Sequence, residues 1–387
     1  MTMYDVEALR QEEFPSAAEI IYFNNASVSL LATSVQEGVK EAAEKLGENA
    51  WAYFDQFLGE ELIEIQRDIA RLIGAGHEDE IVPIVTTSLG INSVAQALPW
   101  AEGDNICLCS IEFPANKYPW WNLERYGVEI RFVEPVDGGL TVEALAAHVD
   151  EKTRLVTVSG VQFFGGHRTD VAALGAFCKS RGILLVVDTI QSIGHVPIHV
   201  EEMGVDILVT GGQKSLLAPP GIGFMYVREE VCERMVPLYT GANGTVEFKN
   251  WLKHDRRPLP GAARFMMGTP NVTGLKGLEA SVKLIQRLGV ENIDQHTRDL
   301  SDLARRGLMT LGYSVMTSAT SYSGILTFAS RLDAAGTDDL VERAAEEKLI
   351  MVKQLDAVGQ AYIRWSFGCY NVMDDVERAL TVMEKLQ

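Results

Sequence analysis

The 387-residue sequence predicts an α/β fold, with a large domain built on a mostly parallel seven-stranded sheet and a smaller C-terminal α+β domain. Three observations support this prediction. Short β-rich runs alternate with amphipathic helical segments from about Ile81 to Val227, which is typical of a parallel sheet with helices on both faces. From about Leu275 the pattern changes to longer helices with a few strands. The length is too great for one compact core and favours two domains.

The predicted strands of the large sheet are short apolar runs. In chain order they are Ile81–Val85, Asn105–Cys109, Glu129–Val133, Leu155–Ser159, Ile183–Val187, Asp206–Val209 and Ile222–Val227. Amphipathic segments such as Thr141–His148 and Asp170–Arg181 lie between strands and are predicted to be helices. The last two strands are separated by too few residues for a long helix, so the last strand could be antiparallel.

The C-terminal part is predicted to contain longer helices: Leu275–Leu288, Val290–Leu311 and a final helix, Met373–Leu386. A few short strands are predicted between them, namely Ser314–Met316, Gly324–Ala329 and Tyr362–Trp365. This mixture of helices and strands indicates a smaller α+β domain.

The sequence also suggests how the two domains divide the chain. We assign residues 17–272 to the large domain, and residues 1–16 together with 273–387 to the small domain. The segment Tyr239–Arg264 is rich in Gly, Pro, Lys and Arg. We expect it to be an active-site loop region that joins the two domains.

Composition and charge exclude several classes of protein. An apolar content of 47% and a charged content of 22% describe a globular protein, not a disordered or fibrous one. The net charge of −19 would repel phosphodiester backbones and anionic membranes, so neither is an expected partner. No signal peptide or membrane-spanning run is visible. The five scattered cysteines include no CxxC motif, so no metal site is expected and a cytoplasmic location is favoured.

Lys214 is the most informative single residue. The apolar run that starts at Val205 ends in Gly211 and Gly212, and Lys214 follows shortly before a Pro/Gly turn. This places an amine at the end of a strand, where small neighbours let another molecule come close. Such a lysine can form an imine with a carbonyl, and pyridoxal phosphate is the usual carbonyl. Because most lysines are solvated surface residues, the cofactor needs support from other positions.

Asp188 and Gln191 supply part of that support. Ligands of parallel sheets bind beyond the carboxyl ends of the strands, and Asp188 ends the most apolar strand. Paired with the pyridine nitrogen, its carboxylate would keep the ring protonated and able to accept electrons. Gln191 could then hydrogen-bond the phenolic oxygen of the cofactor. In isolation Asp188 could equally be a helix cap or a solvated strand end.

A hydroxyl-bearing segment, Thr86–Asn92, follows the first predicted strand and opens a helix. Hydroxyls and free N–H groups at a helix N-terminus form an anion site suited to a phosphate, here around Thr87, Ser88 and Leu89. An ordinary N-cap by Thr or Ser is the alternative.

Together these features resemble the class V aminotransferase family of fold type I pyridoxal-phosphate enzymes. The family includes cysteine desulfurases, isopenicillin-epimerase-like proteins and kynureninase. Residues 205–225 are similar to its lysine signature, including the aspartate eight residues before Lys214 and the Gly-x-Gly after it. Three further blocks match: Tyr22–Ala26, Arg264–Asn271 and Arg364–Asn371. The resemblance runs nearly end to end and implies a fold type I transferase with pyridoxal 5'-phosphate.

The resemblance also implies a role for each cofactor-binding residue. Lys214 would form the imine, Asp188 would contact the pyridine nitrogen, and Gln191 the phenolic oxygen. Phe113 would stack on the pyridine ring. The residues expected around the phosphate are Thr87, Ser88, Leu89 and Gln213.

Other matching residues would serve the substrate and the partner subunit. Arg364 would hold the α-carboxylate of an amino-acid substrate by a bidentate pair, and Asn25 and Ala26 would border the same carboxylate. Thr269, in family members, reaches the phosphate of the neighbouring subunit, which implies a homodimer with shared active sites.

The sequence departs from the desulfurase pattern in three places. Desulfurases carry a histidine where this chain has Phe113, which can stack but cannot move a proton. The family's asparagine after the Leu155–Ser159 strand is missing, with Gln162 and Phe163 in its place. The nucleophilic cysteine that desulfurases keep on a loop before the arginine is absent from Glu346–Met351. Persulfide-forming desulfurase activity is therefore not expected.

The expected function is that of a pyridoxal-phosphate enzyme acting on an amino acid. The substrate amine would displace Lys214, and the freed lysine would remove the α-proton to give a stabilised carbanion. We favour an aminotransferase; a C–S β-elimination lyase or an epimerase is the alternative, and a catalytically silent cofactor-binding scaffold is a third. Aromatic residues that would favour a large or apolar substrate, unless they belong to the core, are Phe113, Phe163, Phe164, Trp251 and Trp365.

Overall fold

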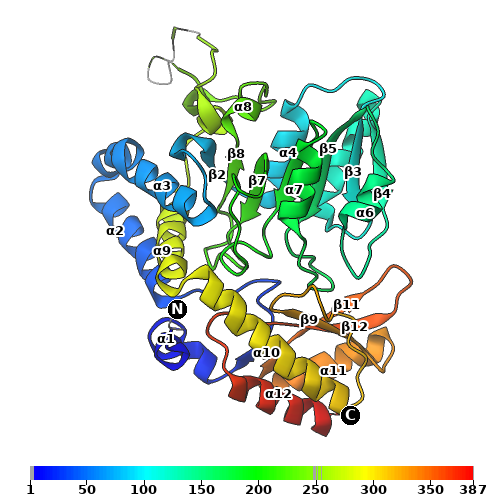
Figure 1. Cartoon of the computed structure of the whole chain (residues 1–387). Helices are drawn as coiled ribbons and strands as arrows, with labels where there is room; N and C mark the ends of the chain where they lie inside the picture. The colour runs from blue at the N-terminus through cyan, green and yellow to red at the C-terminus, as the bar shows by residue number, and fades with distance from the viewer. Residues whose placement is uncertain (1–3, 247–249, 251, 254, 387) are drawn as a thin grey trace.

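A computed structural model describes residues 4–246, 250, 252–253 and 255–386. These residues form two layered parts, one above the other in Figure 1. The upper part contains a seven-stranded sheet with helices on both faces, and the lower part contains a three-stranded sheet covered by helices. The helix α9 (Val272–Leu288) packs along α2 in the upper part and leads into α10 (Val290–Thr310) in the lower part.

The large sheet confirms the predicted topology. Its order is β2-β8-β7-β6-β5-β3-β4, and all strands are parallel except β8, which is antiparallel to both of its neighbours. The strands are β2 (Ile81–Ile84), β3 (Asn105–Cys109), β4 (Glu129–Val133), β5 (Thr153–Ser159), β6 (Leu184–Asp188), β7 (Ile207–Gly211) and β8 (Gly223–Val227). The short connection between β7 and β8 has no room for a crossover helix, which explains the reversed direction of β8.

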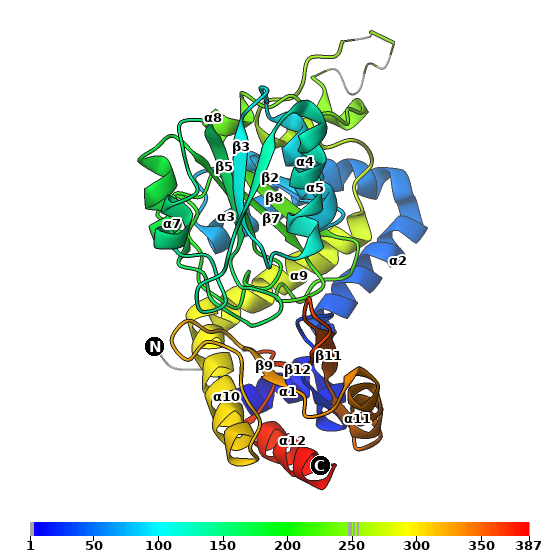
Figure 2. The same cartoon turned by 90° about the vertical axis from the view of Figure 1, so that its right-hand side faces the viewer.

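The central strands β6 (Leu184–Asp188), β7 (Ile207–Gly211) and β8 (Gly223–Val227) are mostly apolar because both faces of the sheet are covered. In β6, Leu185 and Val187 point into one core and Val186 points into the other. Helix α7 lies on the opposite side of the sheet from α4 and α5, as Figure 2 shows. The helices of this part are α2 (Thr33–Gln56), α3 (Leu62–Ile73), α4 (Thr87–Ala97), α5 (Tyr118–Trp121), α6 (Val142–Ala146), α7 (Val171–Lys179) and α8 (Glu229–Cys232).

The lower part is built on an antiparallel sheet of order β11-β12-β9. Its core contains the fully buried side chains of Phe23, Phe328 and Trp365. A two-stranded parallel pair, β1 with β10, joins the N-terminal segment to this part. The elements are α1 (Val6–Glu13), β1 (Ile21–Tyr22), β9 (Ile325–Ala329), α11 (Ala334–Glu346), β10 (Leu349–Ile350), β11 (Val352–Leu355), β12 (Ala361–Ser366) and α12 (Met373–Lys385).

The prediction of a strand at Ser314–Met316 was wrong. Only a single bridge forms there, between Val315 and Phe328, at the edge of β9 that β12 leaves free. Strand β11 was missed because its sequence, Val-Lys-Gln-Leu, has too few apolar residues to suggest a strand.

Trp365 is part of the small core, where its indole N–H contacts Met351 Sδ at 3.3 Å, so it does not line a substrate pocket. Trp251 lies outside the described residues. The described residues of the predicted loop region Tyr239–Arg264 include short helical turns, at Ala242–Gly244 and Gly261–Phe265, and one bridge between Thr245 and Pro258.

The division at residues 17–272 stays a prediction. Within that range, Ile21 and Phe23 pack in the core of the lower part. In the described part of the chain, no helix is both long and apolar enough to cross a membrane.

Candidate active site

Lys214 lies just beyond the carboxyl end of β7. Gly211 and Gly212 precede it, and an ideal Cβ on Gly212 would lie 2.8 Å from Ile222 O and from the Ala218 side chain. Only glycine therefore lets the chain turn back so tightly here. The carbonyl oxygen of Lys214 accepts hydrogen bonds from Ser29 Oγ at 2.7 Å and from Leu217 N at 3.0 Å, which fixes the backbone of the lysine.

The amine of Lys214 is largely shielded from solvent. Its Nζ lies 5.3 Å from the ring centroid of Phe113. Burial lowers the pKa of Lys214, the charge of Asp188 raises it, and the nearby Arg364 lowers it further. The lysine therefore loses its proton more easily than a surface lysine, which is what an amine needs in order to act as a nucleophile or a base.

Asp188 ends β6 and is 2% exposed. Its Oδ1 accepts a hydrogen bond from Ile190 N at 3.0 Å. Burial raises its pKa, with a smaller contribution from the buried Glu112, whereas the Ile190 N–H and Lys214 act in the opposite direction. A cation placed against Asp188 would restore its ionised form, as the proposed pairing with a pyridinium nitrogen requires.

The predicted phosphate site lies at the N-terminus of α4. Thr86 caps the helix through Oγ1, which accepts from Leu89 N at 3.1 Å. The N–H of Leu89 is thus already bonded to protein, and the side chain of Ser88 is exposed. Thr87 is 4% exposed, and its Oγ1 is buried without a hydrogen-bond partner. An unpaired hydroxyl beside a helix N-terminus is suited to an anionic ligand.

Gln213 borders the same space. An ideal Cβ on Gly211 would lie 2.9 Å from Gln213 Oε1 and 3.1 Å from Thr87 Oγ1. The absence of a side chain at Gly211 therefore lets these two polar groups lie close to the end of β7, beside the start of α4. The predicted phosphate residues Thr87 and Gln213 are brought together by the fold.

Arg364 lies on β12 and is 5% exposed. Its Nη1 donates to Phe163 O at 2.8 Å, and its Nη2 donates to Ser27 Oγ at 2.8 Å. Its Nε is buried and has no partner, although a buried guanidinium N–H is costly to leave unpaired. Burial lowers the pKa of Arg364 to about 10, so the side chain is still charged at neutral pH. An unpaired N–H of a cation is an open position for a carboxylate oxygen.

The turn at residues 24–27 connects the arginine with the cofactor side of the site. Asn25 Nδ2 donates to Ser366 O at 2.8 Å, and Ala26 N donates to Ser366 Oγ at 2.8 Å. Gln191 Nε2 donates to Ala26 O at 2.9 Å, so one of its amide protons already serves the protein. Asn25 and Ala26 thus hold the turn in place, and their position beside the substrate carboxylate stays a prediction.

Phe113 follows β3 and is 40% exposed, as expected of a ring that stacks on a ligand. Its ring meets Phe163 edge-on at 5.0 Å between centroids, and Phe163 meets Phe164 at 6.1 Å. Both of these phenylalanines are half-buried. Three of the aromatic residues expected near the substrate therefore do gather at the site.

Sequence reasoning missed Glu112, which is 2% exposed and lies directly before Phe113. Its carboxylate accepts hydrogen bonds from Ser159 N at 2.9 Å, Asn116 Nδ2 at 3.0 Å and Gln162 Nε2 at 2.5 Å. These contacts fix the loop that carries Phe113. Burial raises the pKa of Glu112. The sequence does contain a signal for Glu112, because it is a charged residue between the apolar Ile111 and Phe113 just after a strand.

Two other expected features lie away from this cluster. Asp206, the aspartate eight residues before Lys214, is at the opposite end of β7, where it accepts from Leu185 N at 2.7 Å and pairs with Arg228. Thr269 is exposed, and a role at a partner subunit's phosphate stays a prediction.

The fold and this arrangement define a fold type I pyridoxal-phosphate enzyme that acts on an amino acid. The chain belongs to the class V aminotransferases, because the family model described as Aminotransferase class-V matches residues 21–379. A probable cysteine desulfurase from Pyrococcus abyssi is 28% identical over 394 residues, which cover 97% of this chain and 96% of the relative. An uncharacterized aminotransferase from Bacillus subtilis is 29% identical over 296 residues, which cover 74% of this chain and 75% of the relative.

Comparison with solved structures supports the same family. The apo structure of a cysteine desulfurase from Thermococcus onnurineus superimposes with a TM-score of 0.89 at 26% identity, covering 100% of this chain and 98% of the other. The residues present also fit the cofactor of the family. The unpaired Thr87 Oγ1 suits its phosphate, Asp188 suits a protonated pyridine, and Lys214 suits its carbonyl.

Proposed function

We propose that this chain is an aminotransferase in which Lys214 carries every proton between the substrate and the cofactor. When bound, pyridoxal phosphate supplies the carbonyl that captures the substrate amine and the ring that accepts its electrons. Asp188 would hold the positive charge of the ring nitrogen, and Thr87 and Gln213 would hold the phosphate. Arg364 binds the α-carboxylate through its unpaired Nε and orients the Cα–H bond toward Lys214.

The proton-carrying groups support this proposal. Transamination takes a proton from Cα and returns one to the cofactor carbon, which a single base can do on one face. Lys214, whose pKa burial lowers, is suited to both steps. Epimerisation needs a second proton carrier on the opposite face, and Phe113 at the proposed stacking position has no proton to give. A silent scaffold would have no use for a buried, unpaired Arg364 Nε.

A second candidate is β-elimination from a sulfur-containing amino acid. It is favoured by the relatives named cysteine desulfurases. Transfer of sulfur to an enzyme thiol is disfavoured, because all five cysteines are free and buried, and burial raises their pKa to about 11 or 12. In this case the sulfur would leave as a small-molecule product, and pyruvate and ammonia would form from the carbon skeleton.

An amino-acid panel separates these reactions. The purified holoenzyme is incubated with single amino acids, and keto acid, D-isomer, pyruvate and sulfide are measured. An aminotransferase gives stoichiometric keto acid and aminated cofactor, and turns over only when a keto-acid acceptor is added. Pyruvate formed from cysteine or cystine without an acceptor would favour elimination. Alanine and sulfide formed rapidly from cysteine would contradict the argument from the buried thiols.

The role of Lys214 is tested by Lys214→Ala. We expect loss of the visible absorbance of the lysine imine and a fall in kcat of about 10²–10⁴-fold, the usual contribution of a general base. Lys276→Ala is the control, since Lys276 pairs with Glu61 and Glu279. An unchanged absorbance in Lys214→Ala would overturn the assignment.

We further propose a cytoplasmic homodimer with shared active sites. The exposed side chain of Thr269 is free to reach a partner's phosphate, as the family resemblance implies. Sedimentation of the holoenzyme tests the dimer. A strictly monomeric, fully active enzyme would contradict it.

A further inference from the structure

We propose that Tyr370 is a positioning residue for the substrate carboxylate. Through one hydrogen bond to Asn25, its hydroxyl holds the turn at residues 24–27 in the place where Ser27 orients the guanidinium of Arg364. This inference rests on the proposed role of Arg364 in the preceding section.

The turn at residues 24–27 is the first link. Ser27 Oγ accepts from Arg364 Nη2 at 2.8 Å, while Ala26 O accepts from Gln191 Nε2 at 2.9 Å. A displacement of the turn would therefore rotate the guanidinium that binds the carboxylate, and it would move Gln191 as well. The position of the turn sets the geometry of the substrate site.

Asn25 is the second link, because it fastens the turn to the lower part of the molecule. Its Nδ2 donates to Ser366 O at 2.8 Å and to Tyr22 O at 3.3 Å. Both acceptors are backbone carbonyls, so the amide can satisfy them only with its nitrogen on that side. The amide oxygen must then find a donor on the other side, within a residue that is 5% exposed.

Tyr370 supplies that donor. Its hydroxyl donates to Asn25 Oδ1 at 2.6 Å, and its side chain is fully buried against Phe14, with ring centroids 4.3 Å apart. The space is shaped for this contact. An ideal Cβ on Gly368 would lie 2.8 Å from Tyr370 Cε1 and 3.1 Å from Asn25 Oδ1, so glycine lets the two side chains approach.

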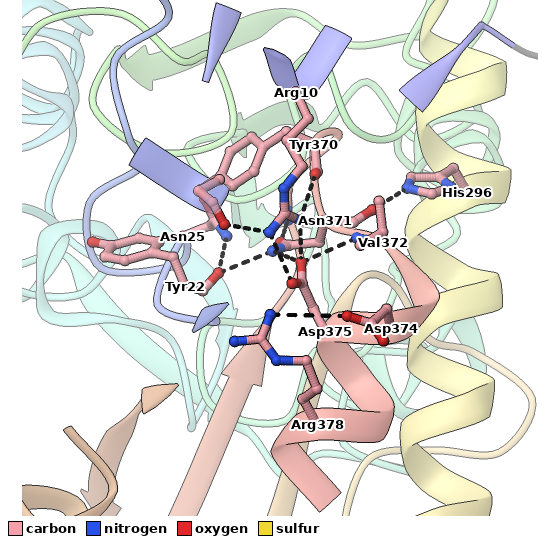
Figure 3. Close-up of polar contacts among 12 residues, drawn as sticks. Arg10, Tyr22, Asn25, His296, Tyr370, Asn371, Val372, Asp374, Asp375 and Arg378 are labelled. Atoms are coloured by element: carbon pink, nitrogen blue, oxygen red, sulfur yellow. Dashed lines mark hydrogen bonds and ion pairs between the residues drawn. The ribbon is translucent and has the colours of Figure 1, made fainter. Parts of the chain in front are cut away.

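A buried polar network holds Tyr370 itself, as Figure 3 shows. Arg10 binds both carboxylate oxygens of Asp375: its Nη1 donates to Oδ2 at 2.6 Å, and its Nη2 donates to Oδ1 at 3.0 Å. Asn371, next to Tyr370, donates to Asp375 Oδ2 at 3.2 Å, and its carbonyl contacts His296 Nε2 at 2.8 Å. The backbone that carries Tyr370 is thus fixed, and the hydroxyl has a defined direction.

The test compares Tyr370→Phe with Tyr4→Phe. Each variant loses one hydroxyl: Tyr4 donates to Cys369 O at 2.7 Å, one residue before Tyr370, and does not contact Asn25. The probe is 2-methylalanine, which has an α-amine and an α-carboxylate but no α-proton. Its binding to the holoenzyme is followed by the change in visible absorbance, and 2-methylalanine amide, which lacks the carboxylate, is titrated in parallel.

We expect Tyr370→Phe to raise the Kd of 2-methylalanine by roughly three- to tenfold, the range for one buried hydrogen bond. The Kd of the amide should not change, because the amide has no carboxylate for Arg364 to hold. Tyr4→Phe should change neither Kd by more than about twofold. Gly368→Ala, whose added Cβ would press on Tyr370 and Asn25, should also raise the Kd of 2-methylalanine.

Arg364→Lys distinguishes the two proposals. It should weaken binding of 2-methylalanine more than Tyr370→Phe does, and leave the amide unaffected. If Arg364→Lys changes neither ligand, the carboxylate role of Arg364 and the inference fail together. If Arg364→Lys weakens 2-methylalanine but Tyr370→Phe does not, or if Tyr370→Phe weakens both ligands equally, only the inference is overturned.

Discussion

At the scale of single residues, the site is made of polar groups that the fold does not satisfy by itself. Thr87 Oγ1 and Arg364 Nε are buried without partners, and Asp188 is buried with a raised pKa. Each of these groups destabilises the protein when no ligand is bound. A ligand that supplies the missing hydrogen-bond partner or the opposite charge would remove this cost. The same groups therefore define what the site binds and make the empty protein less stable than it could be.

Asp188→Asn tests how much the buried Asp188 carboxyl destabilises the apoprotein. The pKa of Asp188 is higher in the folded protein than in the unfolded chain, so the folded protein binds the proton more tightly. The free energy of unfolding therefore falls as pH rises from the unfolded pKa to the folded pKa. Asparagine mimics the protonated acid and keeps the bond from Ile190 N. We expect Asp188→Asn to be more stable than the unsubstituted apoprotein by on the order of 2 kcal/mol above neutral pH, and similar near pH 4.

Urea unfolding of both apoproteins from pH 4 to pH 8 measures this difference. Asp375→Asn is the control, because Asp375 is also buried but has Arg10 as a partner. That substitution should destabilise the protein at neutral pH. A stability gain for Asp188→Asn that is independent of pH would contradict the explanation.

The sequence predicted the site residues that directly follow strands. Lys214, Asp188 and Thr87 meet because parallel strands end at one edge of a sheet, which the strand pattern already implies. Ser27 and Tyr370 could not be found this way. Their partners, Arg364 and Asn25, lie more than 300 residues away in the chain, and nothing in the local pattern specifies such contacts.

At the scale of elements, the N-terminus of α4 depends on how closely this helix approaches the sheet. Gly90 faces the sheet, and an ideal Cβ there would lie 2.5 Å from Val209 Cγ1 and 2.6 Å from Ile84 Cδ1. The close approach at Gly90 brings the first turn, with Thr87, next to the end of β7. A small residue within the helix thus sets the position of the proposed anion site one turn away.

Gly90→Ala is expected to push α4 away from the sheet. Overpacking at such a contact costs about 1–3 kcal/mol, and the displaced helix start should also weaken cofactor binding. Thermal unfolding and a pyridoxal-phosphate titration measure the two effects. Gly47→Ala in α2 is the matched control, since no atom lies within 4 Å of its ideal Cβ. That variant should be neutral or gain up to about 1 kcal/mol; equal behaviour of the two variants would exclude the packing argument.

Elements were predictable where their sequence pattern was strong. All seven strands of the large sheet were found, because strands covered on both faces are continuous apolar runs. The lower sheet was predicted less well. Strand β11 lies at an edge and is only half apolar, while Val315 pairs at a single bridge, so local composition does not separate strand from loop there.

At the scale of the whole molecule, the two ends of the sequence meet. Arg10 from α1 and Asp375 from α12 form a buried ion pair, with side-chain exposures of 8% and 0%. Figure 3 shows this pair beside the exposed pair Arg378–Asp374 on the same helix. The first helix is therefore an integral part of the lower layer.

Arg10→Met tests the strength of this link. Removing one partner leaves a buried, uncompensated carboxylate, which typically costs 3–5 kcal/mol, so we expect a loss of about that size in the free energy of unfolding. Arg378→Met is the control. Its pair with Asp374 is 3.8 Å long and the side chains are 46% and 70% exposed, so less than about 1 kcal/mol should be lost. Equal losses in the two variants, measured by denaturant unfolding, would show that the buried pair is not special.

The contact between Tyr370 and Asn25 has a consequence for biosynthesis. The residues proposed to hold the cofactor, from Thr87 to Lys214, are all translated before the ribosome reaches Arg364. Asn25 emerges early but meets Tyr370 only when 345 further residues have been added. The nascent chain therefore holds all of the proposed cofactor-binding residues before Arg364 and Tyr370 are added, so the proposed hold on a substrate carboxylate is completed only near the end of translation.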